Sequence, residues 1–318
     1  MREHKKSHLG IMGWAIYLAG AMSLGSCSTD ETIESMEPTA ITFGSVSMEN
    51  HSRAVDPSYG QSKLIDNFQV WGTVKGNTNN TIKIFDGATV TRGTAAYGAA
   101  WECSETQYWI PGADYEFLAI VDGNKQGVTE TKLATTEPYM PESITYTADG
   151  VTDLLCQNVS RPQNSDESVV AFQFTHLLSK VHFTFESEFQ NVNVTDIQIT
   201  GHYASGTYNI GTKSWTPGSV STSHISFGDA LGITPANPVT STDAQLIIPG
   251  DNQTLTISFE KDGKVIAEAD RPTITHNFVA NTEYNILVTF EGGEITFTIS
   301  SLEQWDNGDT EQEIPLNP

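Results

Sequence analysis

The chain has 318 residues, enough for two domains of ordinary size, and its 16 lysines and arginines face 39 aspartates and glutamates, a formal net charge of −23. Such an acidic balance argues against binding to nucleic acid and against adsorption to an anionic lipid surface. Charged residues make up only 17% of the sequence, and Ser, Thr, Asn and Gly fill the gap, as is common in extracellular β proteins.

The N-terminus has the layout of an export signal. A short basic region at residues 2–6 is followed by an apolar run from Leu9 to Leu24, which is too short to span a bilayer comfortably. The run ends at Leu24-Gly25-Ser26-Cys27, and small residues before a cysteine are what a lipoprotein signal peptidase accepts. We therefore expect residues 1–26 to be a lipoprotein signal peptide and Cys27 to carry the acyl anchor, palmitate among its chains. An ordinary secretory signal with an incidental cysteine is the alternative.

The mature chain would begin with a tether. Loss of residues 1–26 removes three basic residues and one acidic residue, which leaves a charge of −25. Residues 27–40 hold no apolar pattern and are typical of a flexible tether. The two remaining cysteines, Cys103 and Cys156, either form a disulfide, which export permits, or stay two separate buried thiols.

Further along the chain, apolar residues recur with a period of two, which predicts strands with one face toward water. Asp-Gly at 262–263 and Gly-Gly at 292–293 have the chemistry of hairpin turns. No long stretch of helical period follows residue 30, so we expect an all-β fold of sandwiches. The clearest alternating segments are Phe68–Val74, Ile82–Ile84, Val181–Phe185, Leu255–Phe259, Tyr284–Phe290 and Ile295–Ile299.

A polar segment from Gln157 to Ser168 suggests a domain boundary. It would divide the chain into an N-terminal β-sandwich domain at 41–165 and a C-terminal one at 166–318.

Patterns of catalytic chemistry are missing from the sequence. It contains no Gly-x-Ser-x-Gly elbow and no phosphate-binding glycine loop, so we expect no enzyme activity and no cofactor. His176 and His182 are an even number of residues apart and could share a strand face, but no third ligand stands at metal-site spacing, so we expect no metal.

Several segments, taken in order, resemble the fimbrillin-like lipoproteins of Bacteroidota, the subunits of type V pili. Ser28-Thr29-Asp30-Glu31, directly after Cys27, is similar to the acidic tag that directs such lipoproteins to the outer face of the outer membrane. The other segments are Ile41-Thr42-Phe43-Gly44, Ser52-Arg53-Ala54, Phe68-Gln69-Val70-Trp71-Gly72, Tyr108-Trp109-Ile110-Pro111-Gly112, the run from Phe172 to Val181, and Ile295–Ile299 with Trp305 beyond it.

The resemblance implies two tandem transthyretin-like β-sandwich domains, a surface-exposed lipoprotein of the cell outer membrane, and assembly into a fimbrium by strand exchange. In that scheme a protease cuts behind an arginine, the first strand leaves, and a strand from another subunit takes its place. On this chain the displaced strand would use Ile41, Phe43 and Val46, and the cut would fall between Arg53 and Ala54 unless Arg53 is a plain loop residue. The donor tail would use Ile314 and Leu316.

Two functions follow from these expectations. The first is a structural or accessory pilus subunit that serves adhesion, with other pilus subunits and the outer membrane as partners and no nucleic acid. The second is a surface lipoprotein that does not polymerise and binds a glycan or a host protein. The tail after Trp305 is short and acidic for a donor strand, which leaves open a tip or accessory position.

Overall fold

The computed structural model describes residues 38–48, 55–56, 63–76, 80–93, 101–121, 128–133, 140–162, 169–292 and 294–302. The expected signal peptide, Cys27, Arg53, Ala54, Ile314 and Leu316 lie outside these ranges. Within them the only helical element is one 3-10 turn, η2 (Glu268–Asp270), so the all-β prediction is confirmed. None of the described residues belongs to a helix of the length and apolarity that crossing a membrane requires.

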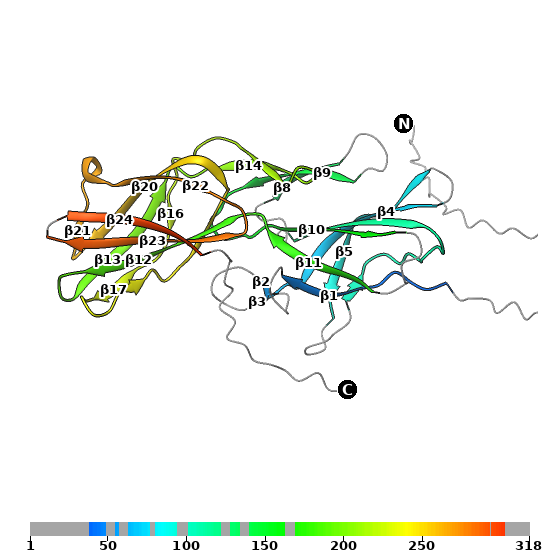
Figure 1. Cartoon of the computed structure of the whole chain (residues 1–318), viewed down its shortest axis with the longest axis horizontal. Coiled ribbons are helices and arrows are strands. Elements are labelled where there is room, and N and C mark those ends of the chain that lie inside the picture. Colours follow the sequence, from blue (N-terminus) through cyan, green and yellow to red (C-terminus); the bar gives the residue numbers. More distant parts are fainter. Residues whose placement is uncertain are drawn as a thin grey trace, which may run out of the picture. The chain divides into compact units, whose positions relative to one another are not determined.

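Residues 43–48, part of the expected exchangeable strand, belong to a seven-stranded sheet. All neighbouring strands are antiparallel except β1, which runs parallel to β11 and is the dark-blue strand beside it in Figure 1. One face of the sheet carries a core rich in phenylalanine, which includes Phe68, Phe85, Phe117 and Phe172. From edge to edge the strands are β1 (Phe43–Met48), β11 (Val170–His176), β10 (Leu155–Arg161), β7 (Asp114–Val121), β4 (Asn67–Lys75), β5 (Thr81–Arg92) and β6 (Trp101–Cys103).

A four-stranded sheet covers part of the other face of this sheet. Trp71 and Cys156 from the larger sheet and Tyr146 and Tyr208 from the smaller one share a second core. The alternation of residues 68–74 predicted a strand with one face toward water, but both faces of β4 are buried along this stretch. The register of β4 against β5 shifts at Trp71. The strands of the small sheet, in order, are β15 (Ser214–Pro217), β14 (Ser205–Asn209), β9 (Pro141–Thr147) and β8 (Val128–Leu133).

A five-stranded and a six-stranded sheet form a sandwich around a third core, to which the alternating residues of β12, β13, β20 and β23 contribute. The five-stranded sheet holds β18 (Val239–Thr240), β12 (Ser179–Ser187), β23 (Thr282–Glu291), β24 (Glu294–Leu302) and β19 (Gln245–Ile247). The six-stranded sheet holds β16 (Ile225–Ser226), β13 (Val192–Thr200), β20 (Gly250–Lys261), β21 (Lys264–Val265), β17 (Ala230–Ile233) and β22 (Thr273–Phe278).

The predicted hairpins lie where the turn residues indicated. At the turn between β20 and β21, Asp262 and Gly263 both have positive φ, 49° and 75°, as a two-residue type I′ turn requires. Glu291 pairs with Glu294 across the second hairpin. A separate small ladder joins β2 (Val55–Asp56) and β3 (Lys63–Leu64).

The division of the chain near residue 166 stays a prediction. Three pairings cross it: β1 and β10 both pair with β11, and β9 pairs with β14.

Candidate functional site

The expected exchangeable strand is an edge strand of the seven-stranded sheet. β1 pairs in parallel with β11, so that Phe43 lies opposite Val170 and Gly44 opposite Ala171. The backbone N–H of Val170 donates to the carbonyl of Thr42 at 2.8 Å. The register shifts between Gly44 and Ser47, the stretch that contains Val46. An irregular parallel pairing at a sheet edge is held by fewer regular hydrogen bonds than the ladders inside the sheet.

The residues just before β1 bond to the opposite end of the same sheet. Ile41 N–H donates to Gln107 O at 2.8 Å, and Trp109 N–H donates to Thr39 O at 2.9 Å. Residues 107–109 follow β6, the other edge strand. The segment 39–48 therefore bridges the two edges of the sheet, and its removal would expose backbone groups on both sides at once.

Phe43 is the side chain that anchors this segment. Its ring is only 3% exposed and its centroid lies 5.5–6.2 Å from four other rings, those of Phe68, Phe85, Phe117 and Phe172. Ile41, 4% exposed, joins the same core two residues earlier. The sequence identified these two apolar positions, but not the four rings around Phe43, which come from β4, β5, β7 and β11. We call this enclosure the Phe43 site.

The rim of the Phe43 site is apolar and open to solvent. Tyr108 and Ile110 are about half exposed on one side, and Val169, next to β11, is about half exposed on the other. Tyr108 lies directly opposite Ala40 in an antiparallel bridge. Large apolar side chains left half exposed on both sides of a strand leave additional contact area for a partner.

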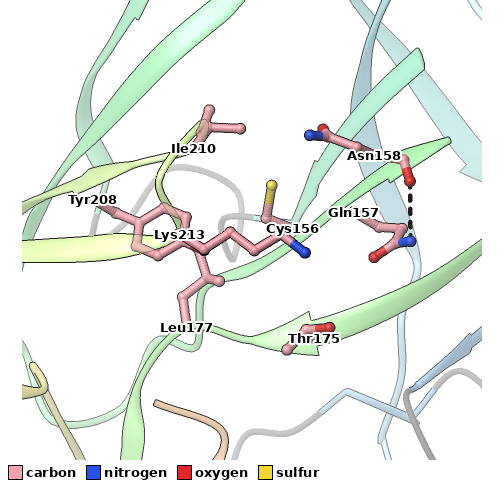
Figure 2. Close-up of a pocket in the computed structure, with 8 residues that line it drawn as sticks. All are labelled: Cys156, Gln157, Asn158, Thr175, Leu177, Tyr208, Ile210 and Lys213. Atoms are coloured by element: carbon pink, nitrogen blue, oxygen red, sulfur yellow. Dashed lines mark hydrogen bonds between the residues drawn. The ribbon is translucent and has the colours of Figure 1, made fainter. Parts of the chain in front are cut away.

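A cavity of about 100 Å³ is the second candidate (Figure 2). It lies between β10, β11 and the β14–β15 hairpin, with the Cys156 thiol on its wall and Lys213 reaching across it. Burial raises the pKa of the Cys156 thiol to about 12, and burial raises the pKa of Tyr208 to about 12. Both groups are therefore protonated at neutral pH, so this thiol lacks the thiolate that nucleophilic chemistry needs.

The two described cysteines are free thiols. Cys103 packs against the phenylalanine core on one face of the seven-stranded sheet, whereas Cys156 belongs to the core on the other face. Of the two alternatives raised by the sequence, the structure therefore has separate thiols, because the body of the sheet stands between them.

The two histidines lie on different strands with different acidic partners. Nδ1 of His176, at the end of β11, is 2.5 Å from Asp153 Oδ2 in a buried pair. Nε2 of His182, on β12, is 3.2 Å from Glu283 Oε1, and Lys180 Nζ is 3.3 Å from Glu283 Oε2. Burial raises the pKa of the Glu283 carboxyl, but His182 and Lys180 outweigh burial and hold it below its ordinary value. Across the described ranges no group of three metal-ligating side chains comes together.

The expected site residues can now be placed. Ile41 and Phe43 belong to one core, and the backbone of Val46 belongs to β1. The expected lipidation site, cleavage site and donor tail fall outside the described residues, so Cys27, Arg53, Ala54, Ile314 and Leu316 remain predictions.

Known proteins share this fold, and one family model matches the sequence. A family model described as fimbrillin-like matches residues 52–305. A fimbrial protein from Bacteroides vulgatus is similar in structure, with a TM-score of 0.56 and 14% identity over 83% of this chain and 99% of that one. A proposed cell adhesion protein from Bacteroides ovatus gives a TM-score of 0.55 and 17% identity over 85% and 98%.

A second proposed cell adhesion protein, from Bacteroides uniformis, gives a TM-score of 0.51 and 16% identity over 84% of this chain and 97% of that one. At these identities the structural likeness establishes the fold alone. No curated protein sequence matches the chain. The family model covers well over half of the sequence, from the residue before Arg53 to Trp305, and on that basis the chain belongs to the fimbrillin-like family of fimbrial proteins.

Proposed function

We propose that this fimbrial protein enters its fimbria by exchange of residues 39–48 for a strand of another subunit. The observation that carries the proposal is the arrangement of residues 39–48. Residues 39 and 41 bond to the segment that follows β6, while β1 forms the opposite edge of the sheet and buries Phe43 among four rings. An incoming strand would restore the backbone hydrogen bonds and refill the same core, which is the physics of strand addition to a sheet edge.

The proposed cut between Arg53 and Ala54 would fall between β1, which ends at Met48, and β2, which begins at Val55. While the chain is intact, β1 rebinds as part of the same molecule and is present at an effective concentration on the order of millimolar. A cut removes that advantage, so a released β1 diffuses away and a donor from another subunit can compete. Uncut protein would then stay monomeric, because β1 would keep β11 paired and closed to a strand from another subunit.

The remaining parts of the proposal concern address and partners. Lipidation at Cys27 would hold the precursor on the cell outer membrane, exposed at the surface. The cut would then separate the subunit from its lipid-anchored N-terminal segment. The partners would be other pilus subunits, to which the tail with Ile314 and Leu316 would donate. We infer a structural role in adhesion without enzyme activity, which the fimbrial family supports.

The test compares Arg53→Ala with Arg53→Lys, a matched change that keeps the charge but denies an arginine-specific protease its residue. Cells that express each variant are examined for intact subunit mass and for ladders on mild-denaturation gels. The proposal expects both variants to retain residues 27–53 and to form no ladder. The wild type should lose residues 27–53 and form a ladder. Normal ladders from both variants would refute the cut site. A wild type that stays monomeric would favour a non-polymerising surface lipoprotein.

A further inference from the structure

We propose that the Phe43 site selects the strand that replaces β1. At the positions now held by residues 41–44, the selected strand carries an aliphatic residue, then any residue, then an aromatic residue, and last a residue with little or no side chain. This inference rests on the proposed strand exchange and specifies the partner that the exchange admits. That partner is a strand of a different fimbrial subunit, because the tail of this chain offers Leu316 where the site fits an aromatic ring.

The requirement for an aromatic residue follows from the shape of the Phe43 site. Phe43 packs nearly parallel to Phe172, at 22°, and edge-on to Phe68, Phe85 and Phe117, at 62–88°. Rings in such arrangements attract one another beyond the area that they bury. An aliphatic side chain of smaller volume would lose these contacts and leave a void among four rigid rings.

The next position must be small. A Cβ added to Gly44 would lie 2.8 Å from Cγ1 of Val169, closer than carbon atoms in folded proteins normally approach. Val169 is β-branched and stiff at χ1, and its carbonyl accepts a hydrogen bond from Arg161 at 3.1 Å, which holds its backbone in place. An incoming strand with a bulky residue at this position would have to displace that neighbour.

Ala40, just before β1, leaves part of its neighbour Tyr108 uncovered, which gives a partner strand a way to bind more tightly. Ala40 lies opposite Tyr108 and is flanked by the two hydrogen bonds of residues 39 and 41. This is a non-hydrogen-bonded antiparallel pair, the type in which the two side chains lie closer together. A methyl group covers little of a tyrosine that is half exposed. A larger apolar residue at the Ala40 position would cover more of the Tyr108 ring.

The tail of this chain matches the required pattern only in part. When Ile314 is set at the Ile41 position, Leu316 falls at the Phe43 position and Asn317 at the Gly44 position. The aliphatic residue and the spacing fit, but the aromatic ring and the small residue are both missing. A second copy of this chain would therefore be a weak donor to the first.

The experiment uses the full mature chain with a sequence-specific protease site in place of residues 49–54, so that the result does not depend on Arg53. After cutting and release of the N-terminal fragment, labelled synthetic peptides are titrated by fluorescence anisotropy. The peptide 38–48 should bind. Its Phe43→Ala variant should bind roughly 100-fold more weakly or worse, and its Gly44→Val variant roughly tenfold more weakly. The tail peptide 309–318 should bind weakly, and its Leu316→Phe, Asn317→Gly variant roughly tenfold more tightly than the natural tail.

The outcomes separate the two proposals. Failure of the wild-type 38–48 peptide to bind cut protein that has lost its N-terminal fragment overturns strand exchange itself. Equal binding of the 38–48 peptide and its Phe43→Ala variant overturns selection at the Phe43 site while exchange stands. A natural tail peptide that binds as tightly as 38–48 would show that copies of this chain suit one another, and would overturn the assignment of the partner to a different subunit.

Discussion

Replacing Phe43 with alanine in the uncut chain should loosen residues 39–48 more than any other part of the protein. The side chain is 3% exposed and contacts four rings, so the substitution should destabilise the local structure by about 4 kcal/mol, within the range for buried phenylalanine. If the segment opens as a unit, that free energy multiplies its open population roughly a thousandfold.

Amide hydrogen exchange measures this opening directly. The N–H groups of Ile41 and Val170 are bonded to Gln107 and Thr42 only while the segment is in place, so their protection should fall with the Phe43→Ala change. Phe189→Ala is the matched control, because Phe189 is 46% exposed at a turn, and it should leave both amides unchanged. Unchanged protection of Ile41 and Val170 in Phe43→Ala would refute the view that Phe43 anchors the segment.

Three further predictions concern other parts of the chain. With Cys27 replaced by alanine, Ellman's reagent should modify the partly exposed Cys103 roughly tenfold faster than Cys156, or more. The reason is that burial raises the pKa of the Cys156 thiol to about 12. Equal rates in the folded protein would contradict that burial. Burial lowers the pKa of His202 to about 4, below its value in the unfolded chain. Between these two pKa values the unfolded chain binds more protons than the folded one. The free energy of unfolding should therefore fall, on the order of 2 kcal/mol, as pH drops from about 6.5 toward 4. His202→Gln should flatten this part of the urea-midpoint profile, and an unchanged slope would exclude His202 as its source. A Cβ at Gly201 (φ +84°) would meet the carbonyl oxygen of Thr254 at 2.2 Å, so Gly201→Ala should lower the melting temperature by several degrees, and an unaltered melting temperature would count against this close approach.

The sequence was informative wherever local chemistry decides the structure. Asp262-Gly263 specified its turn, because few other residue pairs tolerate positive φ twice in succession. Alternation also located the strands that contain Phe183, Ile257 and Val288, because each has one face on a single core. The same rule failed for β4, since a second sheet covers its other face and buries Trp71 there.

Long-range pairing could not be predicted from the sequence. Nothing near β1 indicates that it runs parallel to a strand more than a hundred residues later, or that Phe43 meets rings from four separate strands. The even spacing of His176 and His182 suggested one strand face, but the chain passes from β11 to β12 between them and enters a different sheet. Such partners depend on how distant strands assemble, which local pattern does not record.

The most direct test of the central claim is the intact mass of this subunit recovered from purified fimbriae. Strand exchange after the proposed cut predicts a chain that begins at Ala54 and lacks both the lipid and residues 39–48. A subunit in the assembled fimbria that still contains residues 39–48 would contradict the account, because β1 would then occupy the place assigned to the incoming strand.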